Sequence, residues 1–228
     1  CVIVGVVTGV AAGVAAVAVV VAAGVLIVGG GDGGMAREVL RHQSVETVTM
    51  VEIDEGVIAF SKTYLPSLSG GAFDDPRLNL VIADGADFII ESVDKFDVII
   101  IDSTDPIGPG EALFTDHFYS HAKNRLADGG VMVTQNGVPF MQPDELRGTM
   151  QAFQRLFVDW GCYTACIPTY AGGPMAFGWG ALSPAPRNVS VDMLRERLTA
   201  ARLDLAYYTP DVHKAAFSLP RYIEKLLP

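Results

Sequence analysis

The chain has 228 residues, a formal net charge of −10 at pH 7 and a pI near 4.7. The acidic balance excludes nucleic acid as a partner, because nucleic-acid binding needs a basic face. The length corresponds to one large domain, or to one domain with a small appendage. Three cysteines, Cys1, Cys162 and Cys166, have neither disulfide-framework nor metal-site spacing. We therefore expect a protein of the reducing cytoplasm with small core thiols.

The first 24 residues differ from all that follow, since they contain only Cys, Val, Ile, Gly, Thr and Ala. Their length and apolarity meet the criterion for a membrane span, about 20 residues. However, no Lys or Arg flanks them, they lack the basic start of a signal peptide, and no linker separates them from the next strand. Three interpretations stay open: letters assigned from truncated side-chain shapes, real buried strands, or a membrane or engineered segment. We expect no membrane partner.

From Val25 onward, apolar runs alternate with glycine-containing loops and amphipathic segments. Strands that alternate with helices specify an α/β, doubly wound, mostly parallel Rossmann-like sheet over residues 25–228. The last two strands are expected to form an antiparallel pair at one edge, and residues 67–77 a loop. Strands are expected over 25–28, 48–53, 78–82, 96–101, 130–135, 162–167 and 175–182, and helices over 33–42, 57–64, 86–92, 115–126, 144–160, from 191 and at the end of the chain.

A glycine loop follows the first buried strand. Gly29, Gly31 and Gly34 match the dinucleotide fingerprint, and Glu52 lies about 20 residues on, where a ribose-binding acid is expected. Asp32 within this loop would face a pyrophosphate at close range, which is unfavourable. A positively charged nucleoside without phosphate, such as an S-adenosyl sulfonium compound, would be favoured instead. The alternative is that Asp32 only caps the following helix.

Two further acids end the next strands. Glu52 can accept hydrogen bonds from both ribose hydroxyls, and Asp54 is the better candidate for capping the helix that follows. Asp84 can accept a hydrogen bond from an adenine amino group, while Gly85 permits close approach of the backbone. The alternative for this pair is a plain Asp-Gly turn. Because parallel strands end at one edge of a sheet, these acids should converge on one crevice.

A second acidic loop runs from Asp102 to Pro109 with the sequence Asp-Ser-Thr-Asp-Pro-Ile-Gly-Pro. A primary amine has a pKa near 10, so at neutral pH it is protonated and cannot attack an electrophilic carbon. Asp102 could accept the amine proton as a carbon–nitrogen bond forms, and Asp105 could hold the incoming ammonium. Pro106 and Pro109 would stiffen the loop. The alternative is a polar turn in which Asp102 caps a helix.

Three other features carry less information. Tyr170 precedes Gly172-Gly173 in a late loop that could cover the crevice, where its hydroxyl could bind an amine; it could equally be a packed aromatic. Residues 135–137, Gln-Asn-Gly, end the fifth strand and could line the pocket. His117 and His121 lack the glutamate of a metalloprotease motif, so we expect no metal site.

Together these motifs resemble the spermidine synthases, polyamine aminopropyltransferases of bacterial type, over residues 25–227. The resemblance implies the fold of class I S-adenosylmethionine-dependent methyltransferases. It also implies transfer of an aminopropyl group from decarboxylated S-adenosylmethionine to putrescine, which gives spermidine and 5'-methylthioadenosine. The segments that carry the resemblance are Val25–Gly34, Val51–Asp54, Asp84–Gly85, Asp102–Pro109 and Ile167–Tyr170.

The resemblance also implies roles for individual residues. Asp102 would accept the proton, and Asp105 and Tyr170 would bind the diamine with it. Asp32 would hold the aminopropyl ammonium. The remaining donor contacts would come from Gly29 and Gly31, from Glu52 on the ribose, from Asp84 and Gly85 on the adenine, and from Pro109 on the thioadenosine.

Members of this family need no metal or separate cofactor, since the donor is a co-substrate, and they form homodimers or larger homo-oligomers. They carry a small β domain where residues 1–24 stand here. Three other functions remain: a methyltransferase acting on putrescine, a non-catalytic polyamine or nucleoside binding protein, and a nucleotide-dependent dehydrogenase. Acceptor length and oligomeric state stay open.

Overall fold

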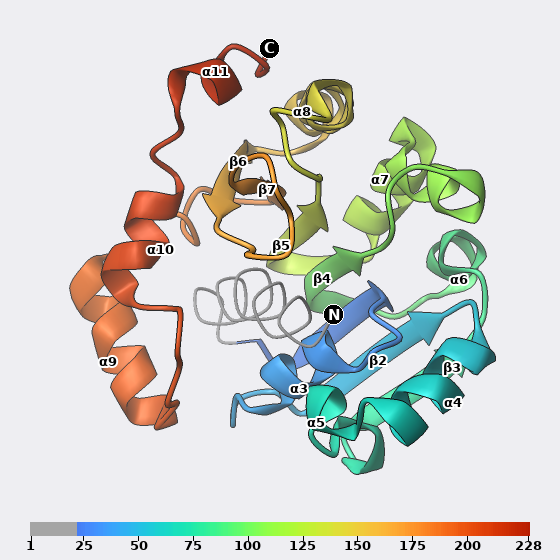
Figure 1. Cartoon of the computed structure of the whole chain (residues 1–228). Helices are drawn as coiled ribbons and strands as arrows, with labels where there is room; N and C mark the ends of the chain where they lie inside the picture. The colour runs from blue at the N-terminus through green and yellow to red at the C-terminus, as the bar shows by residue number, and fades with distance from the viewer. Residues whose placement is uncertain (1–21) are drawn as a thin grey trace.

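The computed structural model describes residues 22–228, which are built on one seven-stranded sheet (Figure 1). The strand order is β3-β2-β1-β4-β5-β7-β6. Neighbouring strands from β3 to β5 pair in parallel, whereas β7 is antiparallel to both β5 and β6. The strands are β1 (Gly24–Gly29), β2 (Thr47–Glu52), β3 (Leu78–Ile82), β4 (Phe96–Asp102), β5 (Leu126–Gln135), β6 (Asp159–Ala165) and β7 (Met175–Ala181).

Helices cover both faces of this sheet (Figure 1). Side chains alternate along each strand, so in β1 Ile27 belongs to the apolar cluster on the face that α3, α9 and α10 cover, while Leu26 belongs to the cluster on the face that α6, α7 and α8 cover. Residues buried on both faces explain the continuous apolar runs of β1 and β4. The helices are α3 (Gly34–Leu40), α4 (Glu55–Tyr64), α5 (Pro66–Ser69), α6 (Gly85–Glu91), α7 (Asp116–Asn124), α8 (Pro143–Leu156), α9 (Val191–Ala201), α10 (Pro210–Ala216) and α11 (Arg221–Glu224), with 3₁₀ turns η2 (Ala72–Asp74) and η3 (Gly108–Phe114).

This topology confirms the predicted α/β, doubly wound, mostly parallel sheet and its antiparallel edge pair. Most predicted boundaries agree with the structure to within three residues, and the larger differences include the following. The helix predicted over 144–160 ends at Leu156, because Phe157 has extended backbone angles and Asp159 begins β6. Strand β5 begins four residues early, at Leu126, which pairs with Phe96 before a shift of register. The predicted loop 67–77 contains most of α5 and all of η2.

Residues 1–21 lie outside the described part of the chain, so the three interpretations of the 1–24 segment stay predictions. The described part begins with buried Ala22, and the backbone N–H groups of Ala23 and Gly24 donate to Asp97 at 2.8 and 2.9 Å. Within residues 22–228, no helix combines the length and apolarity that crossing a membrane requires. Cys162 is buried as predicted, but Cys166 is exposed, so the prediction of a core thiol is wrong there.

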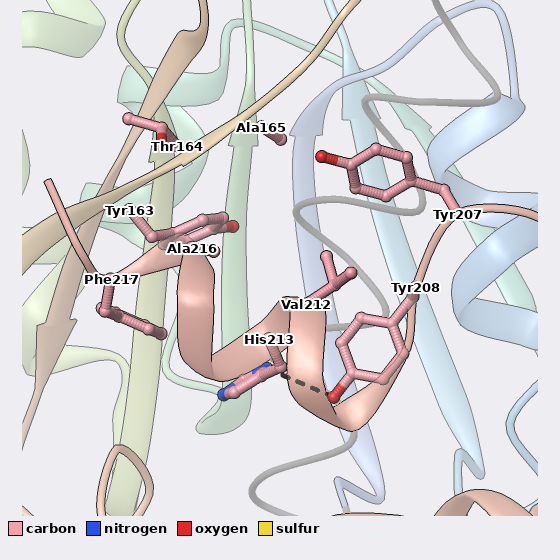
Figure 2. A pocket seen from close by; sticks show the side chains of 9 residues that line it. All are labelled: Tyr163, Thr164, Ala165, Tyr207, Tyr208, Val212, His213, Ala216 and Phe217. Atoms are coloured by element: carbon pink, nitrogen blue, oxygen red, sulfur yellow. Dashed lines mark hydrogen bonds between the residues drawn. The ribbon is translucent and has the colours of Figure 1, made fainter. Parts of the chain in front are cut away.

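Two histidines are buried on the face of the sheet that α3 and α10 cover. His42 follows α3, and burial, with a smaller effect from Arg41, lowers its pKa to about 4. His213 lies in α10, and burial, with a smaller effect from Lys214, also lowers its pKa to about 4. Figure 2 shows its ring beside the Tyr208 hydroxyl, which is hydrogen-bonded to His213 Nδ1 at 3.2 Å. His213 and Tyr208 line a cavity against β6, which has a volume of about 20 Å³ and room for about one water.

We expect these histidines to make the fold sensitive to mild acid. Each has a pKa near 6.5 when unfolded and about 4 when folded, so the unfolded chain binds more protons between these values. The contribution of each histidine to stability is therefore largest above pH 6.5 and falls by about 2 kcal/mol between pH 7 and pH 5. Asp102 and Glu145, whose folded pKa values are raised to about 7, act in the opposite direction over the same range. Urea unfolding at both pH values, compared between the unaltered chain and a variant that lacks the histidine, measures this loss.

His42→Gln and His213→Gln should each reduce the loss, whereas His117→Gln, at an exposed position of α7, should not. Equal pH dependence in all three variants would contradict the expectation.

Candidate active site

The two acidic loops meet where the strand order reverses. Strand β1 pairs with β2 on one side and β4 on the other, so successive crossovers run in opposite directions from it. Gly29, the last residue of β1, is paired with Asp102, the last residue of β4, and Gly30 N–H donates to the Asp102 carbonyl at 3.0 Å. In open α/β sheets ligands bind in the crevice outside such a switch point.

The glycines of the first loop allow this close approach. Gly29 has φ +86°, and a Cβ there would lie 2.2 Å from the carbonyl oxygen of Asp102. A Cβ on Gly31 would lie 2.7 Å from Glu52 Oε2. Larger side chains at these two positions would displace the neighbouring acids or their backbone. The loop therefore packs closely against β2 and β4 at the carboxyl edge of the sheet.

Three carboxylates predicted from the sequence share this crevice: Asp32, Glu52 and Asp102. Burial and, to a smaller extent, the nearby charges of Asp32 and Glu52 together raise the pKa of Asp102 to about 7. Burial also raises the pKa of Asp32, although the Gly34 N–H and Arg37 act against the shift. Like charges raise one another's pKa, and a bound cation would relieve that repulsion. The crevice therefore suits a positively charged ligand.

Local hydrogen bonds fix the two acids of the first two loops. Oδ1 of Asp32 accepts from the N–H of Gly34, the first residue of α3, at 2.7 Å, although the N-cap position itself is occupied by Gly33. Oε1 of Glu52 accepts from Asp54 N–H at 3.0 Å. Asp54 itself accepts from Gly56 N–H at the start of α4, which confirms it as the helix cap. Each bond uses one carboxylate oxygen of its acid, so capping and ligand binding are compatible.

Asp84 and Gly85 have a structural role at the end of β3. Oδ1 of Asp84 accepts from Ala86 N–H at 2.7 Å and caps α6, so the pair begins a helix and does not form the plain turn of the alternative. Gly85 is buried, and a Cβ there would lie 2.4 Å from Val28 Cγ1. Contact with β1 is therefore sufficient to explain the glycine. The contact of this pair with adenine stays a prediction.

The second acidic loop lies beside a late loop. Tyr170 follows β6, is 38% exposed, and has a pKa raised by burial and then by the charges of Asp105 and Asp102. The structure thus brings Tyr170 to the two aspartates, although they are about 65 residues away in the sequence. Gln135 Nε2, at the end of β5, donates to the Ser103 carbonyl at 3.2 Å and links this loop to the sheet. Pro109 is exposed in η3, and its contact with a thioadenosine stays a prediction.

Asn136 does not line the crevice. It is completely buried, its Oδ1 accepts from Thr134 and from Gly178 N–H, and its Nδ2 donates to Thr149 Oγ1 at 2.8 Å. The interpretation of the residue as a pocket wall is therefore wrong. Its amide joins β5, β7 and α8.

Sequence reasoning missed Glu145, in the first turn of α8. Burial and, to a smaller extent, the charge of Asp105 together raise its pKa to about 7. An acid in the first turn of a helix is ordinary, so the sequence carried no signal that this one is special. Among residues 22–228, no group of three or more His, Cys, Asp or Glu side chains could hold a metal ion. Whether the reaction is metal-free stays a prediction.

Comparisons with known proteins agree with the predicted resemblance. The family profile described as "Spermine/spermidine synthase domain" matches residues 7–188. A polyamine aminopropyltransferase of Ruegeria sp. (strain TM1040) is 68% identical over 204 residues, which cover 90% of this chain and 72% of the relative. Polyamine aminopropyltransferase 1 of Pseudomonas aeruginosa is 53% identical over 199 residues, 87% of this chain and 70% of the relative.

Two solved structures have the same fold. A spermidine synthase in complex with the transition-state analogue AdoDATO has a TM-score of 0.86 and 36% identity, over 92% of this chain and 72% of that chain. Spermidine synthase from Thermotoga maritima has a TM-score of 0.86 and 32% identity, over 96% of this chain and 73% of that chain. The prediction of a methyltransferase-type fold is thereby confirmed. The chain belongs to the spermine/spermidine synthase family and is an enzyme that transfers aminopropyl groups.

Proposed function

We propose that the enzyme transfers the aminopropyl group of decarboxylated S-adenosylmethionine to putrescine, giving spermidine and 5'-methylthioadenosine. The observation that carries the proposal is the cluster of Asp32, Glu52 and Asp102 at the switch point of the sheet. The donor carries a sulfonium and an ammonium, and it lacks the carboxylate of the parent compound. Both substrates are therefore cations, which an acidic crevice attracts.

The donor would lie across the glycine loop. Gly29 and Gly31 would allow its close approach, and Glu52 would accept hydrogen bonds from the ribose hydroxyls. Asp32 would pair with the aminopropyl ammonium. Asp84 and Gly85 would contact the adenine, for which Asp84 has its second oxygen, and Pro109 would contact the thioadenosine.

The transfer needs one proton acceptor. An amine of putrescine attacks the carbon beside the sulfonium, a carbon–nitrogen bond forms, and the carbon–sulfur bond breaks with its electron pair going to sulfur. The attacking amine must lose a proton, and Asp102 would accept it before it passes to water. Because the pKa of Asp102 is near 7, the carboxylate is suited to accept and release a proton at neutral pH. Asp105 and Tyr170 would hold the diamine.

The direct test is release of 5'-methylthioadenosine in the presence of putrescine, cadaverine or spermidine. We expect release with putrescine and an equal amount of spermidine. Binding without release for every acceptor would favour a non-catalytic binding protein, and methylated putrescine would favour the methyltransferase. The same panel measures the preferred acceptor length.

Asp32 should make the enzyme prefer the decarboxylated donor. At a 100-fold excess over Kd, this donor should raise the melting temperature by about 5 °C or more, and intact S-adenosylmethionine by less. The carboxylate of the intact donor would face Asp32, whose burial strengthens the repulsion.

Asp32→Asn should reduce the difference between the melting-temperature shifts of the two donors, because it removes the charge that repels the carboxylate of the intact donor. The variant should still fold, since Asn retains an oxygen for the Gly34 N–H. A larger shift with the intact donor in the unaltered enzyme would reverse the assignment of the donor.

We also propose that the enzyme is cytoplasmic, forms a homodimer or a larger homo-oligomer, and needs neither a metal nor a separate cofactor. Light scattering measures the oligomeric state, and an assay in the presence of a chelator tests the requirement for a metal.

A further inference from the structure

Glu145 has a carboxylate oxygen that the fold leaves unpaired. The residue lies in the first turn of α8, and its Oε2 is buried without a hydrogen-bond partner among residues 22–228. A buried oxygen without a partner costs free energy. The neighbouring acid, Asp144, is instead 89% exposed and forms an ion pair with Arg147. Glu145 is therefore placed at a cost that helix stability does not explain.

The chain makes room for this carboxylate at the carboxyl edge of the sheet. Gly137, two residues after β5, has φ +57°, and a Cβ there would lie 3.2 Å from Glu145 Oε2. The same Cβ would lie 2.6 Å from Gln142 Oε1, which accepts from Val138 N–H. Strand β5 is the neighbour of β4, which ends at Asp102. Glu145 thus lies at the same edge of the sheet as the proposed active site.

The charge that acts on Glu145 is that of Asp105, one of the residues proposed to hold the diamine acceptor. A helix N-terminus stabilises a carboxylate and lowers its pKa, yet the pKa of Glu145 is raised to about 7. Burial is the larger cause and the charge of Asp105 the second. Asp105 also acts on Tyr170, as does Asp102. Asp105 is therefore the charged group whose effect Glu145 and Tyr170 share.

The acids of the crevice accordingly form two groups. On the donor side, the charges of Asp32 and Glu52 raise the pKa of Asp102. On the acceptor side, the charge of Asp105 raises the pKa of Glu145. A diamine has two ammonium groups, of which the reacting one must lie beside Asp102 to lose its proton. The other must lie farther along the acceptor, and an unpaired buried oxygen next to a second carboxylate is suited to bind it.

We propose that Glu145 is a positioning residue that binds the distal ammonium of the diamine, together with Asp105. This inference rests on the proposed function, because it concerns the acceptor of the same reaction. Glu145 would distinguish a diamine from a monoamine of equal length, since only the diamine can pair with it.

The test compares putrescine with n-butylamine, which has four carbons but one amine. Glu145→Gln should raise the KM for putrescine at least 10-fold and change kcat less than 3-fold. The inhibition constant of n-butylamine, measured in competition with putrescine, should change less than 3-fold. The matched control is Asp144→Asn, one residue away and exposed, which should leave all three constants within 2-fold.

An unchanged KM for putrescine in a folded Glu145→Gln enzyme would overturn the inference, as would an equal weakening of putrescine and n-butylamine. If this variant does not fold, Glu145→Asp is the second variant to test, because it retains the carboxylate on a side chain that is one methylene shorter. It should raise the KM for putrescine without weakening n-butylamine, and equal effects on both would again overturn the inference. Absence of methylthioadenosine release by the unaltered enzyme would instead show that the proposed function has failed.

Discussion

Asp102→Asn is expected to lower kcat with putrescine by about 100-fold or more, the usual contribution of a general base. Asn has the same shape but cannot take the amine proton. The backbone of residue 102 would keep its place, because its carbonyl accepts from Gly30 N–H. Affinity for the donor should therefore persist while turnover is lost. Methylthioadenosine release under saturating substrates measures the effect, with Asp94→Asn, an exposed substitution between α6 and β4, as control.

The pH profile gives a second measure of the same residue. The folded pKa of Asp102 is about 7, so kcat/KM should fall as the pH falls below 7 and the carboxyl becomes protonated. In Asp102→Asn this inflection should disappear, while the slope due to the amine's own ionisation remains. The variant should be at least as stable as the unaltered enzyme at pH 8, because it removes a buried charge repelled by Asp32 and Glu52. Full activity would remove Asp102 from the mechanism.

Gly29→Ala is expected to lower the free energy of unfolding by about 3 kcal/mol. About 1 kcal/mol comes from placing an L-residue at φ +86°. About 2 kcal/mol more comes from overpacking, because the new Cβ would lie 2.2 Å from the Asp102 carbonyl oxygen. Since that oxygen belongs to backbone, β1 or β4 must move. Activity should fall as well, because Asp102 would be displaced from the crevice.

Urea unfolding measures the loss, and Gly148→Ala is the matched control. Gly148 is exposed within α8, and the described chain places no heavy atom within 4 Å of its Cβ position. Alanine should stabilise that helix by up to about 1 kcal/mol. Similar changes at the two positions would show that the close contact of β1 with β4 is not what requires Gly29.

Much of the fold follows from the sequence, because strand burial and chain direction leave local patterns. The apolar runs at 25–28 and 98–101 predicted strands covered on both faces, and parallel connections predicted that their ends share one edge. The start of β5 was missed, because Asp-Gly-Gly usually marks a turn, whereas here it lies within the strand. That outcome depends on the pairing of Leu126 with Phe96, which no local pattern reveals.

The sequence by itself predicted that Glu52 and Asp102 lie at the ends of strands and Asp32 in the loop after one, and hence that all three lie at one edge of a parallel sheet. That their strands are neighbours came from the structure. Only the tertiary structure decided which carboxylates act on one another. The charges of Asp32 and Glu52 raise the pKa of Asp102, and the charge of Asp105 raises the pKa of Glu145. The reason is that charge interactions depend on distance and burial. For Glu145 both follow from how α8 packs against β6, β7 and η3, the turn that follows the loop carrying Asp105, which the order of residues does not display.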